Sequence, residues 1–451
     1  MEKIFLGALA VAALLTIQVP CALADPPVLV ETDKILASDL GSSHEFGYAV
    51  DIDGGTLVVG SRFDSAYVFE RDGDNPGQWI ETKILVASDG AVNNSFGQAV
   101  SISGNTIAIG AATDSDGGCG ASACGAVYIY ERSQGGADNW GEIKKIRASD
   151  LGVNDQFGRS VDLDEDTLAV GSPANGLAGA VYIFERSLVG PLWGEAKKIT
   201  PSDAGPPGQV FGGSVSLDSD TLLVGSIGGS IQNAGYIFGR DRDGTENWGE
   251  IERIRGADVD GTTSFATSVS ISGNLAIVGA PRDDGVCAPM SDCNAGAVYL
   301  FERNTGGAEN WGEVLKLTAS DFSTGAQFGG SVAVAPGALI IGAASDIEDG
   351  VRSGAAYLFL QGQGGPSDWI EAAKLQASDR DVDDLFGFTV ATDGPSAVIG
   401  VPGDRDICCS SGAAYVFDLP DSPVLIFEDG FESGQTSAWS LVVGEALLNR
   451  R

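Results

Sequence analysis

The sequence predicts an all-β protein, a seven-bladed β-propeller of four-stranded antiparallel blades, and three observations predict it. A unit of roughly 57 residues recurs seven times, which is typical of repeat architectures. Every unit holds short segments in which apolar and polar residues alternate, and no segment sustains a helical period. Glycine, which favours tight turns, is present 64 times. Short strands joined by tight turns therefore account for the whole repeat.

Four residues at regular spacing mark each repeat. A Phe followed by Gly or Ala occurs at Phe46, Phe96, Phe157, Phe211, Phe265, Phe328 and Phe386. An Asp lies seven or eight residues before it, at Asp39, Asp89, Asp150, Asp203, Asp258, Asp321 and Asp379. A Tyr follows in an apolar run, at Tyr67, Tyr128, Tyr182, Tyr236, Tyr299, Tyr357 and Tyr415, and a Trp comes last, at Trp79, Trp140, Trp193, Trp248, Trp311 and Trp369. We expect the Asp carboxylate to accept hydrogen bonds from backbone N–H groups in a turn. We expect the Tyr and the Trp to pack between blades.

The second repeat shows how four strands are predicted. Gln98 to Ser103 alternates, Gly104-Asn105 is a two-residue hairpin turn, and Thr106 to Gly110 alternates again. A third strand is expected over Ala126 to Glu131 and a fourth from about Glu142 to Ala148.

The first copy of the fourth strand, around Val30 to Leu36, precedes the first Phe-Gly pair, and the last set of three strands lacks one. We therefore expect the N-terminal strand to complete the last blade, which closes the ring and removes two exposed sheet edges.

The Phe-Gly pairs, followed by Gly-small-Pro as in Gly171-Ser172-Pro173, are the motif of FG-GAP repeats. The chain resembles the seven-bladed propeller at the head of integrin α subunits, and more closely the bacterial secreted FG-GAP repeat proteins, from Asp25 to about Pro423. The resemblance implies the fold and, for several integrin blades, calcium in the loop between strands one and two. Here each such loop is a two-residue turn, too short to supply six to eight oxygen ligands. We therefore expect no metal site of that type and no cofactor; calcium elsewhere remains an open alternative.

The chain divides into three parts. Residues 1–24 read as a signal peptide, with an apolar run and a small-residue cleavage site at Ala22-Leu23-Ala24, so the protein is expected to be secreted, periplasmic or attached to the cell surface. Residues 25–423 form the propeller, and no segment there is apolar enough to cross a membrane. Residues 424–451 form a tail whose Asp-Gly-Phe-Glu-Ser-Gly run resembles the C-termini of some secreted bacterial proteins; export or sorting is one interpretation and a loosely docked end the other.

Candidate binding residues gather in the loops between strands two and three. These loops and the four–one loops should emerge at the same end of the propeller, and their variable length is typical of binding loops. Six cysteines lie there in three local pairs, predicted as disulfides rather than zinc ligands: Cys119 with Cys124, Cys287 with Cys293, and Cys408 with Cys409.

The same loops carry a set of acids, predicted as a binding face for cations or a basic ligand, with solvated turn residues as the alternative: Asp114, Asp116, Asp283, Asp284, Asp346, Glu348, Asp349, Asp404 and Asp406. The four–one loop before the last blade adds Asp381, Asp383 and Asp384.

Charge and composition narrow the function. A formal net charge of −36 argues against nucleic acid, whose phosphates demand a basic footprint. His44 is the only histidine in the sequence, so at most one catalytic site of the Ser-His-Asp type is possible. We expect a monomeric, exported, non-catalytic binding or adhesion module for a protein or glycan ligand. An extracellular carboxylate-dependent hydrolase or lyase and a structural surface or matrix protein are the alternatives.

Overall fold

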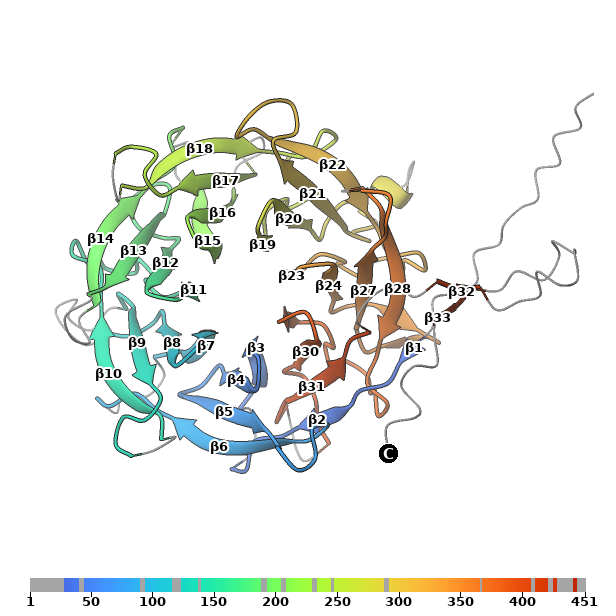
Figure 1. The fold of residues 1–451 in the computed structure, drawn as a ribbon, viewed down its shortest axis with the longest axis horizontal. Helices are drawn as coiled ribbons and strands as arrows, with labels where there is room; N and C mark the ends of the chain where they lie inside the picture. The colour runs from blue at the N-terminus through green and yellow to red at the C-terminus, as the bar shows by residue number, and fades with distance from the viewer. Residues whose placement is uncertain are drawn as a thin grey trace, which may run out of the picture.

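The structure is a computed structural model that describes residues 28–39, 44–89, 94–115, 123–136, 139–187, 193–203, 208–228, 233–244, 247–287, 292–365, 367–406, 410–420, 425–427 and 441–443. The described chain forms a ring of seven antiparallel sheets arranged like blades around a central axis (Figure 1). The predicted all-β, seven-bladed propeller is therefore confirmed.

Each blade is a meander of four strands. The first three blades are β3 (Phe46–Asp53), β4 (Thr56–Ser61), β5 (Ser65–Arg71) and β6 (Trp79–Leu85); β7 (Phe96–Ser103), β8 (Thr106–Ala111), β9 (Ala126–Glu131) and β10 (Gly141–Ile146); and β11 (Ser160–Asp164), β12 (Thr167–Ser172), β13 (Ala180–Arg186) and β14 (Trp193–Ile199). Blades four and five are β15 (Val210–Asp218), β16 (Thr221–Ile227), β17 (Ala234–Gly239) and β18 (Gly249–Ile254); and β19 (Val269–Ser272), β20 (Leu275–Ala280), β21 (Ala297–Arg303) and β22 (Trp311–Leu317).

The last two blades include the N-terminal strands. Blade six is β23 (Ser331–Ala335), β24 (Ala338–Ala343), β27 (Ala355–Gln361) and β28 (Trp369–Leu375), with β1 (Val28–Leu29) added outside it. Blade seven is β29 (Thr389–Thr392), β30 (Ser396–Val401), β31 (Ala413–Asp418) and β2 (Asp33–Ile35). Small pairs outside the meanders are β25 (Ile347–Glu348) with β26 (Val351–Arg352), and β32 (Leu425–Phe427) with β33 (Leu441–Val443); one 3-10 turn spans Gly285–Cys287.

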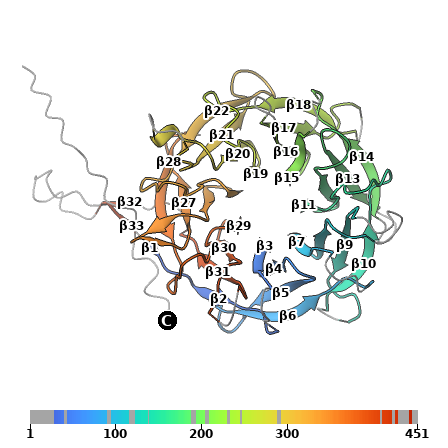
Figure 2. The ribbon, with the colours of Figure 1, turned by 180° about the vertical axis from the view of Figure 1, so that it is seen from behind.

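The first strand of each blade lies innermost and the fourth lies outermost, an order that both views show (Figures 1 and 2). The predicted two-residue turns join strands one and two in blades one to six; Gly104 in the second blade and Glu165 in the third have φ of 56° and 51°. This backbone conformation matches the right-handed twist of a tight hairpin. In blade seven the prediction of a two-residue turn at Gly394-Pro395 is wrong: Thr392 pairs with Ala397, and Asp393 accepts the Ser396 N–H at 2.9 Å within the longer turn. The two–three and four–one loops consequently emerge together at the other end of the propeller.

The hydrophobic core lies between blades, divided into one cluster per neighbouring pair. The cluster between blades one and two joins Val58 and Leu85 to Phe96, Tyr128 and Trp140, all fully or almost fully buried. Neighbouring aromatic rings meet edge to face, since the Phe96 and Tyr128 ring centroids are 5.2 Å apart. The conserved spacing of Phe, Tyr and Trp within the repeat thus reflects blade-to-blade packing, as expected.

The glycine of each Phe-Gly pair brings two backbones together. Gly47 has φ of +84°, and a Cβ there would lie 2.2 Å from the Ala413 carbonyl oxygen of blade seven. A Cβ at Gly60 in β4 would lie 1.9 Å from the carbonyl oxygen of Gly97 in the next blade. Side chains at these positions would separate the blades, which explains why glycine recurs there. The exception, Ala266, adopts φ of +69° despite its methyl group.

The N-terminal segment closes the ring, as predicted, although its strand is shorter than Val30 to Leu36. β2 runs antiparallel to β31, with Lys34 opposite Tyr415. β1 turns away to pair in parallel with β28 of blade six, so that the segment spans two blades (Figure 1). Among the described residues, no helix is long and apolar enough to span a membrane.

Candidate binding site

A buried tyrosine and the repeated aspartate form a hydrogen-bonded pair in every blade. The Tyr hydroxyl donates to the Asp carboxylate at 2.6 to 2.9 Å, in the pairs Tyr67–Asp39, Tyr128–Asp89, Tyr182–Asp150, Tyr236–Asp203, Tyr299–Asp258, Tyr357–Asp321 and Tyr415–Asp379. Burial and these carboxylates raise the pKa of Tyr299 far above its ordinary value, so its hydroxyl keeps the proton that it donates. The partner of the repeated Asp is thus a side-chain hydroxyl rather than the expected backbone amide.

A basic residue on the fourth strand lies opposite this tyrosine in six blades. The cross-strand partners are Lys145, Lys198, Arg253, Lys316, Lys374 and Lys34, whereas blade one has Ile84. Sequence reasoning missed these bases, although in five repeats each follows the Trp by five residues. They supply positive charge beside the repeated Asp, for example 2.7 Å from Lys316 Nζ to Asp258.

An acid from the two–three loop joins the cluster in blades two, five, six and seven. These acids are Asp114, Asp283, Asp346 and Asp404, and their residues are at most 3% exposed. Each lies 2.8 to 3.0 Å from the lysine of its blade. Four members of the predicted acidic face are therefore buried and neutralised inside the blades.

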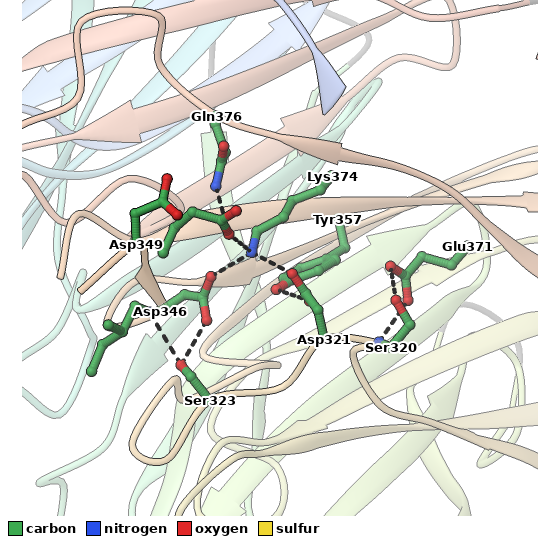
Figure 3. A network of polar contacts seen from close by, with 12 residues as sticks. Ser320, Asp321, Ser323, Asp346, Asp349, Tyr357, Glu371, Lys374 and Gln376 are labelled. Carbon is green, nitrogen blue, oxygen red and sulfur yellow. Dashed lines mark hydrogen bonds and ion pairs between the residues drawn. The ribbon is translucent and has the colours of Figure 1, made fainter. Parts of the chain in front are cut away.

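Blade six holds the most enclosed of these clusters among the described lysines (Figure 3). Lys374 is only 3% exposed, and its Nζ lies 2.6 Å from Asp321, 2.8 Å from Asp346 and 2.6 Å from Glu348. Although burial lowers the pKa of Lys374, the three carboxylates raise it above its ordinary value. Three acids share one ammonium, so the cluster depends on Lys374 for its charge balance.

The blade-seven cluster has the geometry of a metal site but contains an ammonium group. Asp379, Asp404 and Asp406 bring carboxylate oxygens within 4.8 Å of one another. Lys34 Nζ lies 2.6, 2.9 and 2.6 Å from these three acids, and thus where a cation would bind. Lys34 belongs to the N-terminal strand, so this arrangement stabilises ring closure.

The remaining predicted acids are more accessible. Asp349 and Asp406 are exposed, whereas Asp284 and Glu348 are half-buried. Asp349 pairs with Arg380 at 3.0 Å. Asp116 lies outside the described residues.

Three of the six cysteines predicted to form disulfides lie among the described residues. Cys287 and Cys293 form the predicted disulfide, and both are buried in a small cluster with Ala295, separate from the interblade core. Cys124 is buried and disulfide-bonded. Cys119, Cys408 and Cys409 lie outside the described residues.

A cavity of about 480 Å³ opens at the mouth of the central channel, at the end where the two–three and four–one loops emerge. The residue after each Phe-Gly or Phe-Ala pair lines it, at Tyr48, Gln98, Arg159, Gly213, Thr267, Gly330 and Phe388. We call this set the mouth ring. The Phe-Gly pair is nearly invariant among the repeats, yet the next residue differs in almost every blade, so the ring is asymmetric. Such variation at equivalent positions was readable in the sequence.

A second cavity, of about 490 Å³, adjoins the first and shares Tyr48 and Phe388 with it. Their rings are 5.0 Å apart and tilted by 48°. Three arginines line this cavity: Arg62 stacks over Tyr48 at 5.3 Å and pairs with Glu45 at 3.4 Å, Arg352 pairs with Asp383, and Arg405 is exposed. These arginines are not apparent as site residues from the sequence, because acids are more numerous in the same loops.

Two acids lie one layer below the mouth ring. Asp51 in β3 accepts the backbone N–H of Ile102 at 2.7 Å, and Asp162 in β11 accepts that of Leu217 at 2.6 Å. Ser101 donates to Asp162 at 3.2 Å and lies between them. Burial raises the pKa of Asp51 to about 6 and that of Asp162 to about 7.

Comparisons with known proteins agree with this architecture. A family model described as FG-GAP repeat matches seven segments, 29–77, 79–130, 140–184, 193–238, 248–301, 311–359 and 369–417. From the second onward, each match begins at the outermost strand of one blade and ends in the third strand of the next, so repeat and blade are offset by one strand. A search of curated proteins gives no match. A solved structure, "Crystal structure of RRP9 WD40 repeats", has a TM-score of 0.51 at 10% identity, covering 86% of this chain and 97% of that one, a likeness of fold alone.

Proposed function

The chain belongs to the FG-GAP repeat family, and from this premise we propose that it is an exported, non-catalytic binding module whose ligand lies at the mouth of the central channel. An FG-GAP propeller supports a ligand-binding, adhesion-type module in general. The observation that carries the more specific proposal is the asymmetric mouth ring. A rigid ring of equivalent strands presents unlike side chains to one cavity, as specific recognition requires.

Export is proposed from residues 1–24, whose charged start, apolar run and small-residue cleavage site match a signal peptide. Disulfide-bonded loops fit an oxidising compartment. Expression of the full chain with its leader, followed by N-terminal sequencing of the external fraction, tests export and the cleavage site near Ala24.

The binding proposal is tested with the mature protein against immobilised glycan and protein panels. The expected result is retention of a ligand class that is lost when Arg159→Glu changes the mouth ring. The control is Arg242→Glu, an exposed arginine in the three–four loop at the opposite end. Loss of binding in the Arg242→Glu control alone would place the site at the opposite end of the propeller.

The loop disulfides provide a second test of the same face. We expect Cys287→Ser with Cys293→Ser to leave the circular dichroism spectrum unchanged, because this bridge lies outside the interblade core. Closing so short a loop contributes roughly 2 kcal/mol. Ligand binding should weaken in the double variant, because a loop without its disulfide loses more conformational entropy when it binds a ligand. If the variant misfolds, the disulfide is needed for folding rather than for binding.

A carboxylate-dependent hydrolase is the second candidate, and the raised pKa values of Asp51 and Asp162 beneath the cavity favour it. Their bonds to backbone N–H groups of the following blade give both acids a structural role as well. Hydrolysis of a glycan panel by the wild type, abolished by Asp51→Asn or Asp162→Asn, would establish this alternative.

A further inference from the structure

We propose that the channel mouth binds a short carboxylated oligosaccharide, with Arg159 and Arg405 pairing to its carboxylates and Tyr48 and Phe388 packing against its sugar rings. This inference rests on the proposed binding function and names its ligand class. The sequence predicted an acidic binding face, whereas the proposed site is basic. The nearby acids stabilise the surrounding loops and blades.

Charge is the first reason. The formal net charge is −36, yet four arginines and only two acids are among the residues that line the two adjoining cavities. Both acids are paired there, Glu45 with Arg62 and Asp383 with Arg352. Four interior acids of the same end are paired with lysines inside the blades, as Asp404 is with Lys34. The buried Asp384 instead accepts the backbone N–H of Asp381 at 2.6 Å. The cavities therefore form a local basic site on a strongly acidic molecule.

Two arginines remain available for a ligand. Arg159 and Arg405 are exposed, and within the described chain neither guanidinium group has an ion pair, a hydrogen bond or a ring contact. Arginines elsewhere on the propeller are typically paired, as Arg132 is with Glu70 and with the Trp140 ring. A guanidinium presents a planar set of donors that matches a carboxylate. Two unpaired arginines that line adjoining cavities thus indicate an anionic ligand rather than a structural role.

The other lining residues favour a sugar. The half-buried rings of Tyr48 and Phe388 offer flat apolar surfaces that belong to neither neighbouring interblade cluster. Gln98 and Gln327 offer amides, and Ser160 and Thr267 offer hydroxyl groups, in the same cavity. A few aromatic surfaces with convergent polar groups suit a ligand that is polar at its edges and less polar on its faces.

Size and net charge limit the length of the ligand. Cavities of about 480 and 490 Å³ lie within the range that encloses a small ligand. A long polyanion would extend from them over a surface of the same sign, which repels it. We therefore expect short oligomers to bind and long polymers to gain no affinity from their additional units.

The test uses the mature protein and a panel of uronic-acid and sialic-acid trisaccharides, each paired with its methyl ester, in which the carboxylate is neutral. Isothermal titration calorimetry is expected to show binding of at least one acid form, and affinity at least tenfold lower for its ester. Arg159→Gln should lower the affinity by about tenfold or more, because a charged hydrogen bond is lost. Phe388→Ser should also weaken binding, whereas the control Arg242→Gln should not. The circular dichroism spectrum of each variant establishes that it is folded.

The outcomes separate this inference from the proposed function. Equal affinity for acid and ester, or unchanged affinity in both Arg159→Gln and Arg405→Gln, would overturn the carboxylate assignment. Binding of neutral glycans or of an acidic peptide alone would overturn it while leaving the binding function intact. If no acid form binds and the wider glycan and protein panels also give no ligand, both proposals fail.

Discussion

At the scale of single residues, the charge of this protein is organised around tyrosine hydroxyls. The repeated Asp accepts from the Tyr in all seven blades, and where a loop acid is added a lysine balances it. Blade one shows the minimal form, since Ile84 replaces the lysine and, among the described residues, Asp39 accepts from the Tyr67 hydroxyl without a basic partner. The lysine is therefore required where loop acids are buried, because unpaired buried carboxylates are costly.

Lys374→Ile should destabilise the propeller by about 3 to 5 kcal/mol, because it leaves buried carboxylates without a counter-charge. Chemical denaturation measures the loss. Lys83→Ile is the matched control: among the described residues Lys83 Nζ makes one hydrogen bond, to Asn139, so its replacement should cost far less stability. Adding Asp346→Asn and Glu348→Gln to Lys374→Ile should restore part of the stability, and a triple variant no more stable than the single one would contradict the charge explanation.

At the scale of elements, the N-terminal strand fastens the ring through side chains as well as backbone. Ile35 and Ala37 enter the cluster between blades seven and one. Glu31 accepts the Ser378 hydroxyl at 2.5 Å, the same contact that Glu81 makes with Ser38 at 2.6 Å in blade one. The segment thus reproduces, from a distant part of the chain, what the fourth strand supplies locally elsewhere.

Deleting residues 25–37 should expose the outer edge of β31 and leave Asp379, Asp404 and Asp406 without Lys34. We expect lower thermal stability and aggregation, since a free strand edge pairs with other chains. Light scattering and a melting curve measure both, and a variant lacking only residues 25–27 is the control. A monomeric deletion variant with an unchanged melting temperature would rule out closure by this strand.

At the scale of the whole molecule, equivalent positions of the seven blades differ in how much their residues vary. Positions between blades keep their residues because every seam has the same shape. Positions at the mouth vary. In blades one to four the layer below alternates between acids and serines, since Asp51, Ser101, Asp162 and Ser216 each accept an N–H from the next blade. The half-buried acids of this layer make the ring sensitive to pH.

Stability should fall as pH rises from 5 to 8. The pKa of Asp51 is raised to about 6 and that of Asp162 to about 7, above the unfolded value of about 3.9. The folded state therefore holds protons that the unfolded chain releases, so the stabilisation is complete below about pH 4 and is lost through about pH 6 to 7. Discounted for solvent screening, the loss is roughly 2 kcal/mol.

Melting curves of wild type and an Asp51→Asn, Asp162→Asn double variant should diverge from pH 5 to pH 8, with the variant more stable at pH 8. Asparagine keeps the acceptor but cannot ionise. Asp218→Asn, which alters a carboxylate that accepts the Gly273 N–H, is the control. Parallel pH profiles for wild type and the double variant would contradict the assignment.

The architecture can be predicted from the amino-acid sequence, because strand alternation, tight turns and seven aromatic-marked repeats are local patterns that specify one blade and its number of copies. Ring closure followed too, from counting strands. The charge of the candidate site, in contrast, depends on contacts between residues that are far apart in the chain. Asp404 and Lys34 are 370 residues apart yet lie 2.9 Å apart, so whether an acid is exposed or neutralised depends on which distant base the ring brings to it. The sequence shows the acids as a majority; the fold buries and pairs several of them inside the blades and leaves Arg159 and Arg405 unpaired at the channel mouth.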